Sequence, residues 1–185
     1  MSTKVKIDLL SEEDYLQGEL QSDVRHEYVQ GYVYAMVATS KRHNLVAGTL
    51  FAMLRAQLKL TQCRVYISDV KVKIKDIFFY PDLLVSCSDN KLSPYYETDP
   101  VIVVEVLSPS TEAKDRFYKR VAYQRIESLR EYVLVEQDNM QIDVYRRVDD
   151  GWMLERYEIG DTVAFESIDF TIPIEEIYAD VVRLP

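Results

Sequence analysis

The sequence predicts a mixed α/β domain of the α+β kind, with helices flanking a central mixed sheet. Three observations indicate this class: short apolar runs of strand length, two segments with helical periodicity, and a C-terminal part rich in strand patterns. The 185 residues are 48% hydrophobic, which is enough for one sizeable core. Because no internal repeat and no Gly-, Ser- or Pro-rich linker is present, we expect residues 1–185 to form a single domain.

The N-terminal part predicts two helices and a hairpin. Ser11 precedes three acidic residues and is a typical N-cap for a short helix near Tyr15–Leu20. Residues that alternate around a Gln-Gly pair predict a β-hairpin over 26–37. The clearest helix covers 43–60, where apolar residues recur at helical spacing.

Strand patterns resume after this helix. We expect strands at 63–68, 70–75 and 82–87, and an apolar strand buried on both faces at 101–107. Alternate lysines in the second of these predict a solvated sheet face. The connection at 90–99 has no helical pattern, so the strands on either side of it are more easily paired antiparallel than parallel.

This antiparallel pairing would bring two acids together. The start of the strand at 82–87 would lie beside the end of the strand at 101–107, which moves Asp82 towards Glu105. Glu105 lies inside the apolar run VIVVEVL, where an isolated ionised carboxylate is costly unless it is paired, protonated or bound to a cation. Two such carboxylates suit Mg²⁺ or Mn²⁺. In the alternative interpretation, Asp82 caps a turn and Glu105 pairs with a buried Lys or Arg.

A Ser-Pro-Ser-Thr turn and a second helix, at roughly 115–127, follow the apolar strand. Three apolar side chains of this helix are expected to face the core: Phe117, Val121 and Ile126. Asp115 and Lys119 are four residues apart and can share one helix face. Lys119 either forms a surface ion pair with Asp115 or points back over the turn at the two carboxylates. In the second case it would stabilise the negative charge that develops in phosphoryl chemistry.

The charge of the chain is unevenly distributed. The formal net charge is −9, and residues 138–185 alone contain 12 acidic and 4 basic residues. This acidic part predicts strands at 142–148 and 152–159, after a buried strand at 131–136. Residues 112–130, in contrast, contain six basic and three acidic residues. The total charge therefore does not exclude a nucleic acid, because a local basic helix can meet phosphates; an ordinary solvated helix face is the alternative.

Other classes of site and location receive little support. Cys63 and Cys87 stand alone in strand-like runs, so we expect reduced core thiols rather than a disulfide or a metal site. No glycine-rich phosphate loop, Gly-x-Ser-x-Gly elbow or Cys/His cluster is present, so P-loop hydrolysis, serine hydrolysis and zinc binding lose their usual sequence support. The first residues lack the apolar core of a signal peptide and no run is long enough to span a membrane, so we expect a cytoplasmic protein with no membrane partner.

Several motifs taken together resemble the Uma family of restriction endonucleases, which belongs to the PD-(D/E)XK nuclease superfamily. They are HEYVQGYVYAM at 26–36, YPDLLV at 80–85 and VEVLSPST at 104–111, and the last is the most specific because Asp115 and Lys119 follow it. The resemblance covers nearly the whole chain. It implies a restriction-endonuclease-like fold.

The resemblance also implies roles for individual residues. Asp82 is the Pro-Asp acid, Glu105 the second acid and Glu27 an additional N-terminal acid, and these three are the expected ligands of Mg²⁺ or Mn²⁺. With Lys119 they form the expected catalytic set. His43 and Asp115 are the expected accessory residues.

One position departs from the superfamily pattern, in which a lysine stands two residues after the second acid. That position is Leu107 here, and the resemblance implies that Lys119, from the following helix, supplies the lysine instead. The implied function is a Mg²⁺-dependent endonuclease that hydrolyses phosphodiester bonds of DNA. We expect a homodimer, because cleavage of two strands generally needs two active sites. The alternatives are a non-catalytic binding or regulatory module that retains the nuclease fold, and a phosphohydrolase for small substrates.

Overall fold

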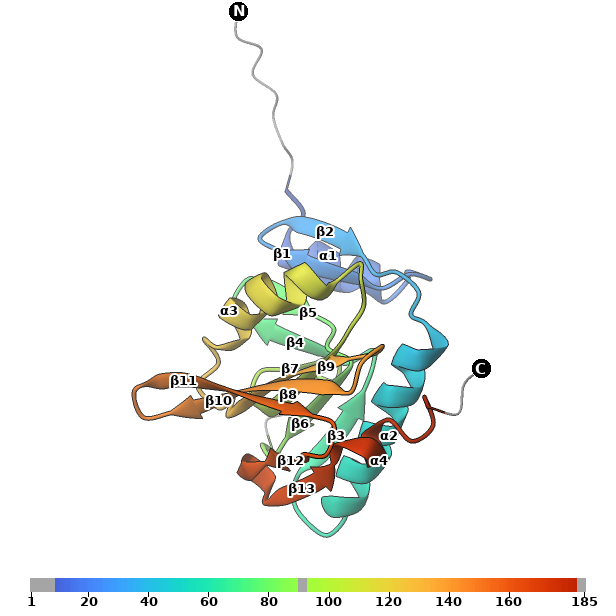
Figure 1. Ribbon diagram of the computed structural model, residues 1–185. Helices are drawn as coiled ribbons and strands as arrows, with labels where there is room; N and C mark the ends of the chain where they lie inside the picture. Colours follow the sequence, from blue (N-terminus) through green and yellow to red (C-terminus); the bar gives the residue numbers. More distant parts are fainter. Residues whose placement is uncertain (1–8, 90–92, 183–185) are drawn as a thin grey trace, which may run out of the picture.

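A computed structural model describes residues 9–89 and 93–182 (Figure 1). Short helical segments and one long helix surround the sheets. They are α1 (Glu12–Glu19), α2 (Lys41–Gln57), the π-helix η1 (Lys114–Lys119), α3 (Arg120–Tyr123), the 3-10 helix η2 (Glu166–Ile168) and α4 (Ile174–Ile177). None of the helices in these two ranges is long and apolar enough to cross a membrane.

The strands form two large sheets and a two-stranded ribbon. The first sheet has the order β2-β1-β5-β4-β7 and contains β1 (His26–Val29), β2 (Tyr32–Ala35), β4 (Lys71–Ile74), β5 (Ile77–Phe79) and β7 (Tyr96–Glu97). The second has the order β11-β10-β9-β8-β6-β3 and contains β3 (Arg64–Ile67), β6 (Leu83–Ser86), β8 (Pro100–Leu107), β9 (Glu131–Glu136), β10 (Gln141–Val148) and β11 (Gly151–Glu158). The ribbon consists of β12 (Thr162–Phe165) and β13 (Phe170–Pro173).

The six-stranded sheet separates two apolar cores. On one face, α2 and the C-terminal ribbon and helix pack against residues such as Val104 and Val106 of β8. On the other face, α3 and the five-stranded sheet pack against Val103 and Leu107. Because side chains alternate along a strand, Glu105 points to this second face, between Val103 and Leu107.

Most of the predicted elements are confirmed. Ser11 is the N-cap of α1 and accepts a hydrogen bond from the backbone N–H of Asp14, β1 and β2 form the predicted hairpin, and α2 lies where the clearest helix was expected. Strands β6 and β8 pair antiparallel, as the connection without a helix predicted. Strand β5 is an additional strand that the sequence pattern did not predict.

The segment after β8 differs from the regular helix expected at 115–127. A π-helix comes first and the short α3 follows it, so a different set of residues faces the sheet. Asp115, Lys119 and Tyr123 are buried, whereas Phe117 is 66% exposed and Val121 is also exposed. The prediction that Phe117 and Val121 face the core was therefore wrong, because the wider turn of a π-helix does not follow the period of an α-helix.

Of the three lysines predicted to lie on a solvated sheet face, Lys75 is exposed, but α1 covers the side of β4 that carries Lys71 and Lys73. Lys71 is buried and its Nζ donates a hydrogen bond to Tyr80 Oη at 3.1 Å. Lys73 forms an ion pair with Glu12 of α1. A short helix that returns over the sheet thus converts an apparently exposed face into a partly buried polar one.

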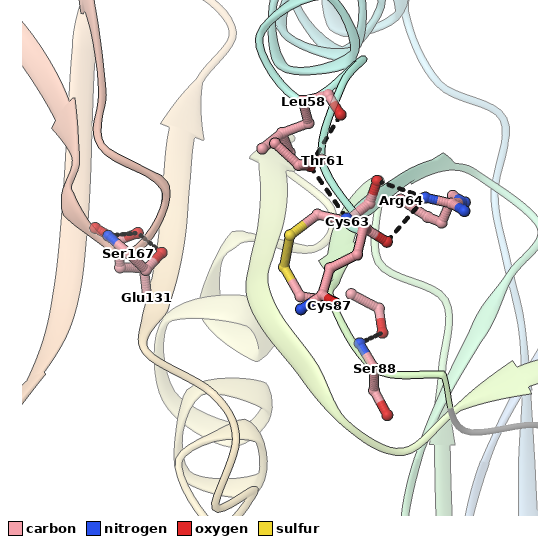
Figure 2. Close-up of a disulfide and its surroundings, with 10 residues drawn as sticks. Leu58, Thr61, Cys63, Arg64, Cys87, Ser88, Glu131 and Ser167 are labelled. Carbon is pink, nitrogen blue, oxygen red and sulfur yellow. Dashed lines mark hydrogen bonds between the residues drawn. A yellow bond between two sulfur atoms is a disulfide. The ribbon is translucent and has the colours of Figure 1, made fainter.

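Cys63 and Cys87 form a disulfide (Figure 2), so the expectation of reduced thiols was wrong. Strands β3 and β6 pair antiparallel with Arg64 opposite Ser86. The next position of this ladder places the two cysteines opposite each other. Their proximity follows from strand pairing between distant segments, which the spacing of the cysteines alone does not reveal.

Candidate active site

Two acids meet at the ends of neighbouring strands. Leu83 lies opposite Val104 in the β6–β8 pairing, so Asp82, just before β6, lies next to Glu105. The backbone N–H of Val106 donates a hydrogen bond to Asp82 Oδ2 at 2.7 Å. His43 of α2 places its Nε2 3.2 Å from the same oxygen. Asp82 is thus oriented from both sides, by the sheet and by the long helix.

Glu105 is buried on the face of the sheet that η1 and α3 cover. Its Oε1 accepts hydrogen bonds from Lys119 Nζ at 2.9 Å and from Tyr123 Oη at 3.3 Å. Burial raises the pKa of Glu105 well above its usual value; Lys119 opposes this rise, whereas Asp115 and Asp82 add to it. Glu105 therefore lies in an environment that strongly favours a cation or a proton.

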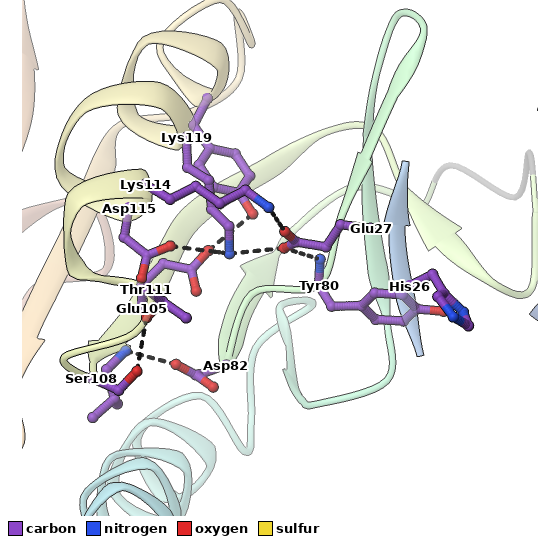
Figure 3. A network of polar contacts seen from close by, with 12 residues as sticks. His26, Glu27, Tyr80, Asp82, Glu105, Ser108, Thr111, Lys114, Asp115 and Lys119 are labelled. Carbon is purple, nitrogen blue, oxygen red and sulfur yellow. Dashed lines mark hydrogen bonds and ion pairs between the residues drawn. The ribbon is translucent and has the colours of Figure 1, made fainter. Parts of the chain in front are cut away.

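Lys119 points back over the Ser-Pro-Ser-Thr turn into the same site (Figure 3). Its Nζ lies 2.9 Å from Glu105 Oε1, 2.9 Å from Glu27 Oε1 and 3.2 Å from Asp115 Oδ1. Burial alone lowers the pKa of Lys119, but the surrounding carboxylates outweigh burial and hold the pKa well above its usual value. Of the two orientations considered for Lys119, the structure therefore has the one directed at the carboxylates, and its amine is positively charged.

The π-helix and the turn before it place this lysine. The backbone N–H of Glu112 donates to the carbonyl of Ser108 at 2.9 Å, and that of Asp115 donates to the carbonyl of Thr111 at 3.0 Å. Tyr132 of β9 donates from its hydroxyl to the carbonyl of Asp115 at 3.0 Å. The start of η1 is thus held both by the Ser-Pro-Ser-Thr turn and by β9, and Asp115 is buried.

Glu27 joins the site from β1, on the other side of the lysine. Its Oε1 lies 2.9 Å from Lys119 Nζ, and its Oε2 forms an ion pair with Lys114 (Figure 3). Burial raises the pKa of Glu27, but Lys119 and Lys114 outweigh burial and bring the pKa below its usual value. Lys114 was not identified from the sequence, although it belongs to the basic run at 112–130 that could have indicated it.

These side chains line a cavity of about 210 Å³. Its walls come from three places: the strand ends with Asp82 and Glu105, the π-helix with the two lysines, and the segment 34–39, which contains the end of β2 and the residues after it. Glu27 and His43 also line it. All six residues predicted for the site, together with Lys114, therefore border one cavity.

The arrangement of acids limits the metal site that the chain could form. Within residues 9–89 and 93–182, no three His, Cys, Asp or Glu side chains are grouped closely enough to hold a metal ion. Glu27 is bound to two lysines, on the side of the site away from Asp82. Asp82 and Glu105 remain as a pair of hard oxygen donors, which fits Mg²⁺ or Mn²⁺ because Mg²⁺ commonly binds one or two carboxylates and keeps several waters.

Comparisons with known proteins agree with this fold. One similar crystal structure is that of a protein from Anabaena variabilis, described as a "putative nuclease belonging to DUF820". It superposes on this chain with a TM-score of 0.72 and 15% sequence identity, and the match covers 85% of this chain and 92% of that chain. This likeness shows that the chain has the restriction-endonuclease-like fold.

Two relatives come from Synechocystis sp. The uncharacterized protein slr1290 is 37% identical over 91% of this chain and 91% of its own length. The uncharacterized protein sll1609 is 30% identical over 79% of this chain and 86% of its own length. The model of the Uma2 family, described as "Putative restriction endonuclease", matches residues 12–175. With this match over most of its length, and with the fold of a nuclease, the chain belongs to the Uma2 family.

Proposed function

We propose that this protein is a metal-dependent nuclease that hydrolyses phosphodiester bonds of DNA in the cavity between β6, β8 and η1. The observation that carries the proposal is Lys119, a buried and charged lysine in contact with three carboxylates next to Asp82. Such a cation is suited to stabilise the charge that develops on a phosphate during hydrolysis. The family and the fold support the same reaction class.

Asp82 and Glu105 would hold the metal ion, Mg²⁺ or Mn²⁺. A bound divalent ion would polarise the scissile phosphate and lower the pKa of an attacking water. Ligand carboxylates must be ionised, so the raised pKa of Glu105 predicts that binding of the metal displaces a proton. His43 would keep Asp82 in position through its contact with Oδ2.

The lysines would act on the substrate side of the site. Lys119 would stabilise the negative charge of the pentavalent phosphorus. Glu27 would serve as the carboxylate that orients both Lys119 and Lys114, and this role differs from the metal ligand that the family resemblance implied. Asp115 would hold Lys119 from its own helix at 3.2 Å.

The test is cleavage of supercoiled plasmid in Mg²⁺ or Mn²⁺ by the wild type and by Asp82→Asn, Glu105→Gln and Lys119→Met. We expect the wild type to convert the plasmid and the three variants to lose at least about 100-fold in rate. Glu131→Gln, at the start of β9 and outside the cavity lining, is a matched control because it also removes a buried, ion-paired carboxylate. Equal cleavage by all preparations would show that the activity is a contaminant.

A second candidate is a non-catalytic module that retains the nuclease fold. It is favoured by one observation: the lysines already compensate much of the charge of Glu27 and Glu105, so the cluster is partly neutralised without a metal. Calorimetric titration separates the two functions. Binding of Mn²⁺ that disappears in Glu105→Gln supports the nuclease, and absence of binding in the wild type supports the module. Cleavage of both strands would need two copies of the site, and light scattering of the DNA-bound protein tests for such a homodimer.

A further inference from the structure

Two exposed aromatic rings stand beside Lys114, and one of them, Tyr34, lines the cavity. Tyr34 of β2 is 48% exposed and Tyr118 of η1 is 45% exposed. Lys114, also of η1, reaches across to β2 and places its Nζ 5.0 Å from the centre of the Tyr34 ring. The ring of Tyr118 packs edge-on against Phe79 with centroids 6.0 Å apart, so it has a fixed support. We call Tyr34, Lys114 and Tyr118 the aromatic rim.

The aromatic rim is connected directly to the site. Tyr34 lies opposite Glu27 in the β1–β2 pairing, so its ring stands on the same face of the sheet as that carboxylate. Lys114 contacts both of them, through an ion pair with Glu27 and through the face of the Tyr34 ring. Tyr34 also lines the cavity, together with the exposed Met36 and Val37. A nucleotide chain that reaches Glu105 would therefore pass the aromatic rim.

Depth and charge both disfavour an intact duplex as the substrate. Glu27, Glu105 and Lys119 are buried at the bottom of a cavity of about 210 Å³, which a single strand can enter more easily than a base-paired one. Binding of duplex DNA depends on many phosphate contacts to basic side chains. This chain has a net charge of −9, and residues 112–130 hold only 6 of its 22 lysines and arginines. Stacking of bases on aromatic rings, in contrast, provides affinity that does not depend on many charges.

We propose that the aromatic rim stacks unpaired nucleobases, so that the site takes single-stranded DNA or an unpaired segment within a duplex. The proposal rests on the nuclease function proposed above and names its substrate class. Tyr34 and Tyr118 provide faces on which neighbouring bases stack. Lys114 meets the phosphate between them, because its amine contacts both the Tyr34 ring and the buried Glu27.

The test measures binding without divalent metal, so that it does not depend on cleavage. Fluorescence anisotropy compares a labelled single-stranded oligonucleotide with the same strand in a duplex. We expect the wild type to prefer the single strand, and each of Tyr34→Ala and Tyr118→Ala to weaken single-strand binding about fivefold or more. Tyr34→Phe and Tyr118→Phe keep the ring face and should bind like the wild type. Tyr95→Ala is the matched control, because Tyr95 is 50% exposed and precedes β7 at the opposite edge of the same sheet.

Three results from the binding and light-scattering measurements would overturn the proposal. One is equal affinity of the wild type for single strand and duplex, and another is an equal loss in the Tyr95→Ala control. The third is that light scattering shows a dimer for the wild type and a monomer for Tyr34→Ala. A second copy of the chain would then cover the aromatic rim. Cleavage is measured separately on both substrates. Plasmid cleavage that persists in the rim variants would leave the nuclease standing and refute only the substrate class, whereas single-strand binding without any cleavage would refute only the nuclease.

Discussion

Removal of the charge of Lys119 should be the most costly single change at the site. Lys119→Met keeps most of the volume of the side chain but leaves Glu27, Glu105 and Asp115 buried without their shared cation. The side chain of Lys119 is 6% exposed and each of the three contacts is between 2.9 and 3.2 Å. Loss of one partner of a buried ion pair costs about 3–5 kcal/mol, and we expect the free energy of unfolding to fall by that amount at neutral pH.

The size of this loss should depend on pH. Burial and the neighbouring acids raise the pKa of Glu105, and burial also raises the pKa of Asp115. Near pH 5 these carboxyl groups bind protons in the variant, which relieves much of the repulsion, so the cost of Lys119→Met should be smaller there than near pH 8. The protonation of Lys119 itself adds no pH dependence over this range. A raised lysine pKa gives stability that is lost only as the pH rises above the usual lysine value.

Urea unfolding followed by circular dichroism at both pH values measures the effect, with equal slopes required for a valid comparison. Lys114→Met is the matched control. Its side chain also forms an ion pair with Glu27 but is 32% exposed, so its removal should cost about 1 kcal/mol or less. Two results would contradict this prediction. One is a loss in free energy of unfolding for Lys119→Met no larger than that for Lys114→Met, and the other is an equal loss for Lys119→Met at both pH values.

Three further predictions concern the acids and the disulfide. The raised pKa of Glu105 means that ionisation of this carboxyl group opposes folding. The wild type should therefore lose stability relative to Glu105→Gln as the pH rises above 4.5, the usual glutamate pKa. A difference in urea midpoint that stays constant with pH would contradict this prediction. Glu27→Gln should keep the Mn²⁺ affinity of the wild type but lose about tenfold or more in plasmid cleavage, whereas loss of Mn²⁺ binding in calorimetry would make Glu27 a metal ligand. Cys63→Ser should lower the free energy of unfolding by about 3 kcal/mol, because it opens a loop of sequence separation 24, and a reductant should lower the stability of the wild type but not of the variant.

Local patterns predicted the frame of the site correctly. The connection between β6 and β8 lacks helical periodicity, and this feature alone made antiparallel pairing the simpler prediction. Antiparallel pairing then fixed which strand ends meet, so the proximity of Asp82 and Glu105 followed without any knowledge of the third dimension. The burial of Glu105 was likewise visible, because the residues around it are apolar on both sides.

The missed features all depend on contacts between distant segments. The π-helix is held by the hydroxyl of Tyr132 on the carbonyl of Asp115, and no spacing within 114–123 indicates that contact. The same is true of Lys71, which α1 covers, and of the cysteines, which meet only through the β3–β6 pairing. Helical and strand periods report how a segment presents its side chains, but they do not report what is packed over them.

Under the proposed function, Lys119 would compensate for the departure of this chain from the superfamily pattern. Leu107, where that pattern has its lysine, points to the same face as Glu105 and is buried in the core beneath α3. The space above Glu105 is instead occupied by Lys119, which descends from the helix that connects β8 with its parallel neighbour β9. A parallel pair needs a crossover connection, usually a helix, and here that connection passes over the end of the strand that carries Glu105. Lys119 on that helix reaches Glu105 at 2.9 Å, so the proposed site would have its cation although a lysine is absent from position 107.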